Sequence, residues 1–482
     1  MRLLRKNDES ASVQVKASTA YTICSVIQRS LSFITLPVFS RLLTTDEYGL
    51  STVYSSTMAI LIIFTSLQLP YGTFTTAMVK FEDDRRGYVS AVNGLCTLLM
   101  LAYFAIYIPL HSYWDKLLDL PEFLMIIMGF EMLASTSLNF WMSLQRFEYR
   151  YKQVVFVTLL SSFASTAVAI IAVVSTDSNR GVVKLLAYSL TAIAIGLFFY
   201  VQSFALGKKF YDKQYWHYAL SFNLPLIPYY VSQMIFNQSD RLMINSMCGR
   251  SDAAKYGVAY SLAIILNFVL NAINDSYTPW LYRKIKEKDF ATNKKVALAI
   301  AGLMAFLLLG VITLAPEIIY VLAGSKYADA VWVVPPVAMS LLFLFYTQLF
   351  ANIEFYYEEK YYLVGGSILS AVTNIVLNWI FIKIFGYVAA AYTTLFSFIL
   401  FALCNYFCMI AVCKKHDLDW HIYNVKALVL LSIVFMAAGF VMMAFYNLLA
   451  VRILIVLIVL AIVFVKRKPI IAKAKGYIGL FK

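Results

Sequence analysis

Three arginines stand inside or at the end of long apolar segments of this sequence: Arg29, Arg41 and Arg241. A guanidinium group is planar and forked, and it binds phosphate oxygens through parallel hydrogen bonds. Within a bilayer a cation costs about 2.5–3.5 kcal/mol unless it faces water, protein or an anion. The three arginines therefore predict a site for a phosphate-bearing anion. For Arg29 an alternative is a structural ion pair with a buried acid such as Glu131.

Amide and hydroxyl side chains recur in five apolar segments of the chain. Their spacing within each segment would place them on a single face of a helix. Hydrogen bonds between helices, at about 0.6 kcal/mol each, would account for some of them. Five polar faces spread over both halves of the chain favour a water-filled cavity instead. The residues predicted to line this cavity are Gln28, Ser32, Gln233, Asn237, Asn267, Asn271, Asn274, Asn374 and Asn378. Two acids, Glu131 and Asp275, are too few to make the cavity acidic.

The segments that carry these residues belong in a membrane. The chain has 482 residues, of which 61% are hydrophobic and 14% are charged, against about 25% charged in soluble proteins. A span needs about 20 apolar residues. We predict fourteen spans, at 17–42, 50–78, 89–109, 122–144, 153–175, 183–206, 218–246, 257–280, 296–315, 332–354, 362–382, 387–411, 425–446 and 452–466.

The net charge of +14 is explained by position, because most basic residues fall in alternate gaps between the spans. About 28 lie on one side and about 7 on the other, which places the basic side and both termini in the cytoplasm. We see no cleavable signal peptide, and there is no phosphate-binding loop that would indicate a fused ATPase. The predicted organisation is a cytoplasmic tail at 1–16, an N-terminal lobe at 17–206, a linker at 207–217, a C-terminal lobe at 218–412, and two appended helices with a basic tail at 413–482.

A short motif occurs twice, once in each half. Ser40-Arg41-Leu42-Leu43 is followed by Tyr48-Gly49, and Asp240-Arg241-Leu242-Met243 is followed by Tyr256-Gly257. Both copies lie where one apolar segment ends and the next begins, which is typical of transporters built from two related halves. The alternative is a chance recurrence of ordinary dipeptides.

The sequence predicts no metal site and no cofactor. Its six cysteines form no Cys-x-x-Cys pair. Cys413, His416, Asp417, Asp419 and His421 crowd one predicted cytoplasmic loop, but their spacing fits no standard zinc signature. We interpret them as a solvated loop.

The motifs resemble those of the bacterial polysaccharide (O-antigen type) flippases, in the multidrug/oligosaccharidyl-lipid/polysaccharide exporter superfamily. The resemblance rests on residues 36–43 with 47–50, on Ser239-Asp240-Arg241-Leu242-Met243-Ile244, and on Gly324-Ser325-Lys326-Tyr327 with Ala330, and it covers roughly residues 15–415. It implies an all-α polytopic membrane protein of about 14 transmembrane helices. Two six-helix bundles would form a V-shaped, MATE-like fold, with an extra C-terminal helix pair.

The resemblance also implies a function that is transport and not catalysis. The substrate would be an undecaprenyl-diphosphate-linked oligosaccharide, flipped across the bacterial inner membrane by alternating access. Arg29, Arg41 and Arg241 would meet the diphosphate, and the polar faces of the cavity would meet sugar. Glu131 or Asp275 would couple flipping to a proton or sodium gradient. A polysaccharide polymerase and a chain-length regulator are expected partners in the same membrane, besides its lipids, and nucleic acid is not.

Three other functions are weighed against this one. The related drug-exporting branch commonly has an Asp within its first span, and this sequence has none there. A membrane glycosyltransferase or polymerase would need catalytic residues on a sizeable extracytoplasmic loop. The longest such loop, around 317–331, carries little beyond Glu317, Lys326 and Asp329. A purely structural scaffold fits poorly with buried arginines and asparagines.

Overall fold

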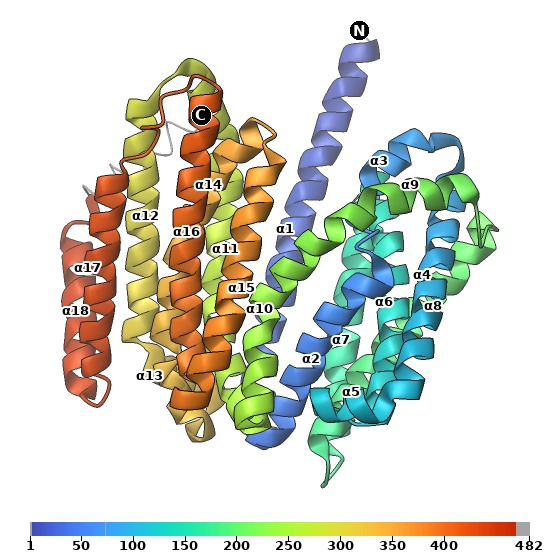
Figure 1. Ribbon diagram of the computed structural model, residues 1–482, viewed down its shortest axis with the longest axis horizontal. Helices are drawn as coiled ribbons and strands as arrows, with labels where there is room; N and C mark the ends of the chain where they lie inside the picture. The colour runs from blue at the N-terminus through green and yellow to red at the C-terminus, as the bar shows by residue number, and fades with distance from the viewer. Residues whose placement is uncertain (1, 73, 469–482) are drawn as a thin grey trace. The chain divides into compact units, whose positions relative to one another are not determined.

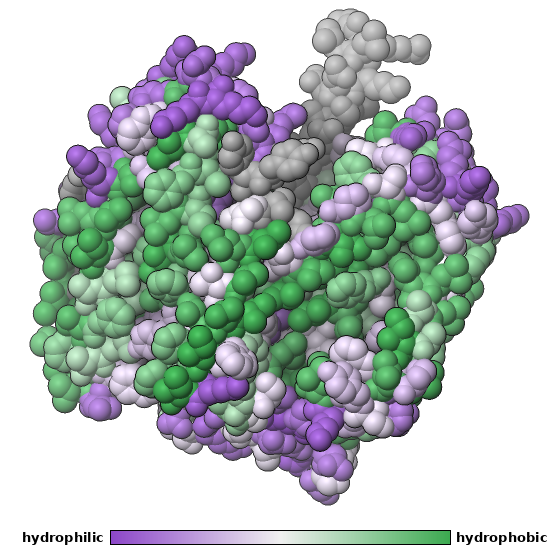
Figure 2. Space-filling view, in the orientation of Figure 1, coloured by the Kyte–Doolittle hydropathy of each residue, from purple (hydrophilic) through white to green (hydrophobic). Residues whose placement is uncertain are grey.

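The computed structural model describes residues 2–72 and 74–468, apart from some side chains within these ranges, and over them it consists of helices joined by turns (Figure 1). Two compact units divide the chain, Met1–Ala254 and Lys255–Lys482. In each unit apolar residues cover the middle of the helices and hydrophilic residues gather at their ends (Figure 2). This is the pattern of helices that cross a bilayer.

The first unit contains ten helices in the described residues, and the second begins within α11. In chain order the helices of both units are α1 (Arg2–Leu42), α2 (Thr45–Ser66), α3 (Phe74–Lys80), α4 (Arg85–Tyr107), α5 (His111–Leu118), α6 (Glu122–Phe147), α7 (Tyr151–Val174), α8 (Arg180–Gly207), α9 (Lys213–Asn223), α10 (Ile227–Cys248), α11 (Arg250–Glu287), α12 (Phe290–Thr313), α13 (Ala315–Ala323), α14 (Val334–Tyr356), α15 (Lys360–Phe385), α16 (Ala389–Lys415), α17 (Val425–Ala444) and α18 (Leu449–Val465).

The all-helical, multi-pass prediction is confirmed, with an approximate number of spans. Within the described residues, twelve helices are long and apolar enough to cross a membrane. The two predicted spans outside this set correspond to α10 and α18. Helix α10 has 22 residues but carries Gln233, Asn237, Asp240 and Arg241. In α18 the apolar stretch, Leu449–Ile458, is shorter than those of the twelve helices.

The prediction of one continuous span at 50–78 is wrong. Helix α2 ends at Ser66, whose hydroxyl accepts the N–H of Gln68 at 3.2 Å, and Leu67 and Gln68 have φ values of 48° and 53°. Pro70 then disfavours a helical conformation at the preceding residue, and the chain restarts as α3. The apolar pattern continues across this break because its residues enter a protein core.

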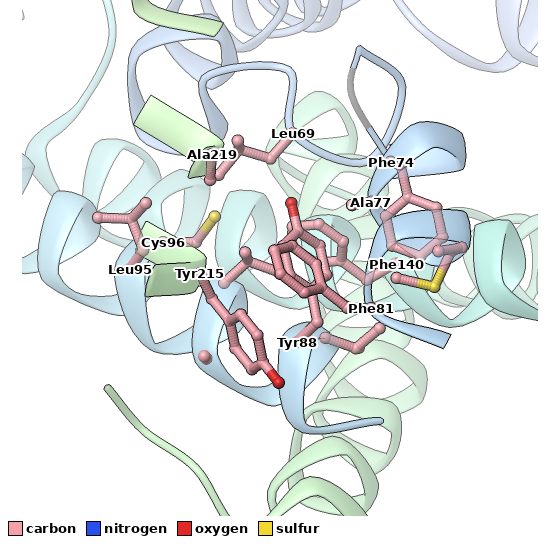
Figure 3. Close-up of a cluster of buried hydrophobic side chains, with 14 of the residues drawn as sticks. Leu69, Phe74, Ala77, Phe81, Tyr88, Leu95, Cys96, Phe140, Tyr215 and Ala219 are labelled. Carbon is pink, nitrogen blue, oxygen red and sulfur yellow. The ribbon is translucent and has the colours of Figure 1, made fainter. Parts of the chain in front are cut away.

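That core is shown in Figure 3, where side chains of the α2–α4 region meet those of α9. Phe81 stacks on Tyr88 with ring centroids 5.4 Å apart and meets the ring of Tyr215 edge-on at 4.7 Å. Leu69 and Phe140 are 1% and 0% exposed in the same cluster. The segment after α2 is therefore anchored on α4, α6 and α9.

The predicted span at 218–246 is broken at Pro225 and Pro228. A short 3₁₀ turn, Leu224–Leu226, separates α9 from α10. The break after α2 lies against this one, because a Cβ at Gly72 would come within 2.3 Å of Asn223 Oδ1. A side chain at position 72 would displace the side chain of Asn223.

Packing assigns α10 to the first unit, where it lies along α2 (Figure 1). Ser56 of α2 donates a hydrogen bond to Gln238 Oε1 of α10 at 3.1 Å. The sequence places the lobe boundary at the 207–217 linker, whereas the division by packing follows Ala254. The linker itself is tied to α4, since Lys209 Nζ donates to Asp84 Oδ2 at 2.7 Å. This bond, more than any other contact, raises the pKa of Lys209.

In the second unit α17 packs against α12 and α14, and α18 is held by an ion pair. Arg452 Nη2 donates to Glu317 Oε1 of α13 at 2.7 Å, and Nη1 donates to the carbonyl oxygen of Tyr446 at 2.6 Å. The Arg452 side chain is 5% exposed and that of Glu317 is 34% exposed. The appended helix pair is thus connected to the bundle by a mostly buried charge pair.

Replacing Arg452 by Met is expected to lower the free energy of unfolding by about 1–2 kcal/mol, because Glu317 loses its cation but keeps partial access to solvent. Thermal unfolding of the purified protein in detergent measures the loss. The double variant E317Q/R452M should recover much of it, since no charge then lacks a partner. If R452M alone unfolds like wild type, the pair does not hold α18.

Candidate functional site

A carboxylate near mid-membrane depth joins three helices of the first unit. Glu131 Oε2 on α6 accepts hydrogen bonds from the hydroxyls of Tyr54 on α2, at 2.7 Å, and Ser189 on α8, at 2.6 Å. The two hydroxyls are themselves 3.1 Å apart. Each residue comes nine positions after the first residue of its helix, Thr45, Glu122 or Arg180. At 1.5 Å per residue this is about 14 Å from the helix end, close to the middle of a bilayer.

This arrangement suits a group that binds and releases a proton. Both donors to Glu131 are neutral hydroxyls, and the ion pairs of the described residues do not include Glu131. A buried carboxylate without a cation is costly when ionised, and two hydroxyl donors reduce this cost. The sequence identified Glu131 but missed Tyr54 and Ser189. Their signal in the sequence is a hydroxyl group within a predicted span, at 50–78 for Tyr54 and at 183–206 for Ser189.

The first copy of the repeated motif forms a junction at the ends of several helices. Thr44 and Glu47 make a capping box at the start of α2, with the Thr44 N–H donating to Glu47 Oε2 at 2.9 Å. Glu47 Oε1 also accepts the N–H of Gly181, at the start of α8, at 3.3 Å. One carboxylate thus caps two helices, and Arg180 Nη1 donates to the last carbonyl of α1, that of Leu42, at 3.4 Å.

The turn between α10 and α11 also contacts this junction. Arg250 binds both carboxylate oxygens of Asp119, at 2.6 and 2.8 Å, and Ser251 donates to Thr45 Oγ1 at 2.8 Å. A Cβ at Gly49 would lie 2.1 Å from the carbonyl oxygen of Arg250. The glycine of the Tyr-Gly motif is therefore required by backbone contact, which is a structural role.

Arg241 of α10 is buried, at 8% exposed, and is an electrostatic neighbour of Tyr48 on α2. Its Nη1 donates to Gln238 Oε1 at 2.6 Å and to the carbonyl oxygen of Asn237 at 3.1 Å. Gln238 Oε1 is the acceptor that also holds Ser56. The guanidinium group is thus fixed in orientation by its own helix.

The other two predicted arginines differ from Arg241. Arg41 is exposed at the end of α1, where its Nη1 donates to the carbonyl oxygen of Pro37 at 3.3 Å. The side chains of Arg29 and Ser32 lie outside the described residues. On the same helix, Gln28 Nε2 donates to Ser162 Oγ of α7 at 2.8 Å.

The predicted sugar-contacting amides of α10 reach the surface. Asn237 is exposed, and its Nδ2 donates to the carbonyl oxygen of Gln233, one turn earlier, at 2.7 Å. Gln233 is half-buried. Both lie on the helix that carries Arg241, one and two turns before it.

In the second unit, amides of α11 pair with amides of α14. Asn271 Nδ2 donates to Asn267 Oδ1 at 3.2 Å, and Asn271 Oδ1 accepts from Gln348 at 2.9 Å. One turn further, Asn274 Oδ1 accepts from Asn352 at 2.9 Å. Asp275 follows Asn274 and is exposed. Asn271 and Asp275, both exposed, give this part of α11 a polar face, which fits contact with water and not with lipid.

Asn374 and Asn378 are placed differently, since both are 0% exposed between α15 and α16. Asn378 Nδ2 donates to Asn374 Oδ1 at 3.1 Å and Asn374 Nδ2 donates to Thr394 at 3.4 Å. Thr393 donates to Asn378 Oδ1. In this structure their hydrogen bonds join helices, which is the alternative that the sequence left open for such amides.

Sequence reasoning missed a second buried acid, Glu354 on α14. It is 0% exposed, and neither carboxylate oxygen accepts a hydrogen bond within the described residues. Cys408 of α16 is an electrostatic neighbour. Its signal in the sequence was a single acid among the apolar residues that end α14. Glu354 is therefore a second candidate for proton exchange.

A cavity of about 600 Å³ in the first unit also has polar and aromatic lining. It lies between the break after α2 and the end of α6, and Tyr71, Ser143, Arg146 and Tyr149 are among its lining residues. Arg146 is exposed and its guanidinium lies 5.8 Å from the ring centre of Tyr21 on α1. A cation between tyrosines can bind a phosphate and stack a sugar ring.

One group of described residues has the composition of a metal site. Ligand atoms of His111, Asp115 and Glu122 lie within 4.8 Å of one another at the ends of α5 and α6. Asp115 already accepts a hydrogen bond from the Tyr107 hydroxyl at 2.6 Å, and all three side chains are at least partly exposed. The group is accounted for as a surface cluster of polar residues.

Comparison with known proteins bears on this arrangement. A family model described as polysaccharide biosynthesis protein matches residues 15–285. Protein 1 of the Lsg locus of Haemophilus influenzae is 24% identical over 374 residues, which cover 74% of this chain and 88% of the relative. The lipid II flippase MurJ, in an inward closed conformation, has a similar fold with a TM-score of 0.67 at 14% identity, covering 93% of this chain and 99% of MurJ. An inward-facing multidrug resistance MATE family transporter of the MOP superfamily gives 0.61 at 12% identity, covering 83% and 99%.

Proposed function

Because this chain belongs to the polysaccharide biosynthesis protein family, we propose that it flips an undecaprenyl-diphosphate-linked oligosaccharide across the bacterial inner membrane. Translocation would proceed from the cytoplasmic to the periplasmic leaflet by alternating access, driven by a proton or sodium gradient. The family match over residues 15–285 is the observation that carries this proposal. The likeness of fold to a lipid II flippase over 93% of the chain supports it.

Such a substrate sets a physical problem that these side chains can address. A diphosphate and several sugar hydroxyls must pass about 30 Å of hydrocarbon while the prenyl chain stays in lipid. The buried guanidinium of Arg241 is held in place by Gln238, and the amides of Asn237 and Gln233 lie one and two turns before it. We propose that Arg241, with Arg29 and Arg41, meets the diphosphate and that the amides of α10 and α11 meet sugar.

Glu131 is the proposed coupling residue, with Asp275 as the alternative from the sequence. Tyr54 and Ser189 hold the Glu131 carboxylate at mid-membrane depth, where a bound proton would respond to the membrane potential. Moving one positive charge inward releases about 2.3 kcal/mol of free energy per 100 mV of membrane potential. One coupled proton can therefore drive translocation toward the periplasmic leaflet.

The test is deletion of the encoding gene followed by mass spectrometry of the lipid-linked oligosaccharides, with surface polysaccharide measured in parallel. We expect one undecaprenyl-diphosphate oligosaccharide to accumulate on the cytoplasmic face while the surface glycan disappears. Wild-type protein should restore the surface glycan and remove the accumulated oligosaccharide. A variant with Arg241 replaced by Ala should do neither. Normal surface glycan in the deletion strain would refute the proposal.

The likeness to a multidrug resistance transporter supplies the second candidate function, export of drugs or other small cations. It predicts a different phenotype. The deletion strain would then keep its surface glycan and become more sensitive to cationic drugs, and the oligosaccharide pool would not change.

A further inference from the structure

A second cavity of the first unit is not used by the proposed function. It has a volume of about 490 Å³ and is lined by parts of α4, α6, α7 and α8. Helices α6 and α8 end beside it, at Phe147 and Gly207, and α4 and α7 begin beside it, at Arg85 and Tyr151. The cavity therefore lies at one end of the helices, at the level of lipid headgroups, on the side that the distribution of basic residues predicts to be cytoplasmic.

The polar end of the cavity carries positive charge. Arg86 of α4 and Arg150, directly before α7, both line it and are both exposed. Arg150 Nε is 3.1 Å from the carboxylate of Glu148, which also lines the cavity. Two guanidinium groups against one carboxylate leave an excess of one positive charge. The first turn of α7 adds the positive end of a helix dipole beside Arg150.

Two glutamines deeper in the cavity have unused acceptors. Gln145 is 6% exposed, and its Oε1 accepts no hydrogen bond within the described residues. The same holds for Gln202 Oε1. Both side chains line the cavity, from α6 and α8 respectively. A buried amide oxygen costs about 1–3 kcal/mol without a donor, so a ligand that offers hydroxyl groups would stabilise this site.

Apart from Gln153 and Ser203, the rest of the lining is apolar. Trp141 and Phe199 pack with ring centroids 4.4 Å apart. Phe156 and Phe198 line the cavity and are 65% and 62% exposed. These side chains present the kind of surface on which an acyl chain packs.

We propose that this cavity binds an anionic phospholipid with hydroxyl groups on its headgroup, such as phosphatidylglycerol. Arg86 and Arg150 bind the phosphate, glycerol hydroxyls donate to Gln145 and Gln202, and an acyl chain lies on Phe156 and Phe198. Basic pockets between transmembrane helices on the cytoplasmic side are suited to anionic headgroups. This lipid differs from the transported substrate, because it stays bound to the protein and does not cross the membrane.

The experiment measures binding of phosphatidylglycerol to the full-length protein in detergent micelles by native mass spectrometry, with phosphatidylcholine of the same chains as reference. We expect wild type to prefer phosphatidylglycerol. The double variant R86Q/R150Q should bind it about 25-fold more weakly, from about fivefold per arginine. Q202L should weaken phosphatidylglycerol and leave phosphatidylcholine unchanged. The matched control K295Q/K414Q removes two basic side chains from the same predicted membrane side and should not change binding.

Three results would overturn the proposal. The first is equal binding of the two lipids, and the second is an equal effect of R86Q/R150Q and K295Q/K414Q on phosphatidylglycerol binding. The third is a dissociation constant for glycerol 3-phosphate as low as that for the lipid, which would indicate a site for a free phosphate. Should R86Q/R150Q not fold, a photoactivatable phosphatidylglycerol added to wild type decides. Cross-links in peptides from α6, α7 and α8 support the site, and their absence from these peptides refutes it.

Discussion

Replacing Glu131 by Gln is expected to lower gradient-driven translocation about 50-fold while the protein remains folded. Loss of one coupled charge removes about 2.3 kcal/mol at 100 mV, and 1.36 kcal/mol corresponds to a factor of ten. A glutamine oxygen can still accept from Tyr54 and Ser189, which now donate at 2.7 and 2.6 Å, so the packing of α2, α6 and α8 should survive. What is lost is the capacity to exchange a proton.

The measurement is delivery of lipid-linked oligosaccharide to the periplasmic face, with the proton and sodium gradients collapsed separately. The exposed acid Glu122 on the same helix supplies the matched control, since E122Q should behave like wild type. E354Q and D275N are measured in parallel. Should E131Q keep a transport rate that still falls when the gradient is collapsed, coupling lies elsewhere, and whichever of E354Q and D275N loses transport identifies it.

Replacing Gly49 by Ala is expected to lower the free energy of unfolding by about 3 kcal/mol, the upper part of the usual cost of overpacking. The added Cβ would lie 2.1 Å from the carbonyl oxygen of Arg250 and 2.5 Å from its carbonyl carbon. Both contacts are with backbone, so no side-chain rotation relieves them. The turn at Arg250 is also fixed by its bonds to Asp119, so it resists displacement.

Thermal unfolding of the two proteins in the same detergent, with the yield of folded protein after purification, tests this expectation. Gly302 of α12 provides the control, because no heavy atom lies within 4 Å of a Cβ built there. G302A should be stabilised slightly, by up to about 1 kcal/mol, through higher helix propensity. A G49A protein as stable as wild type would show that α2 and the turn before α11 are not in close backbone contact.

Several features of the fold follow directly from the sequence. The bilayer requires about 20 apolar residues per span and leaves no backbone group without a hydrogen bond, so apolar segments predict helices with little ambiguity. Pro225 and Pro228 favour the break between α9 and α10 because a proline inside a helix removes a backbone donor. Glu131 was recognisable because an acid inside a span is costly and rare.

The break after Ser66 illustrates why hydropathy was insufficient there. Leu67, Leu69, Phe74, Ala77 and Met78 are as apolar as a membrane span, and all five are buried in the protein core of Figure 3. Apolar side chains satisfy both environments, so composition does not distinguish lipid from core. The turn is set by Ser66 and Pro70, whose effect on the backbone is local.

The sequence by itself determined a multi-pass helical protein, its family resemblance and the residue types of its polar faces, because these depend on local composition and spacing. Only the tertiary structure decided what each polar group meets. Glu131 lies 77 residues from Tyr54 and 58 from Ser189, and Gly49 touches Arg250 about 200 positions away. Helical periodicity assigns a residue to a face, but the neighbour of that face is chosen by packing. Asn271 remains on a partly exposed face and Asn378 is buried between helices for this reason, although both are asparagines within apolar spans.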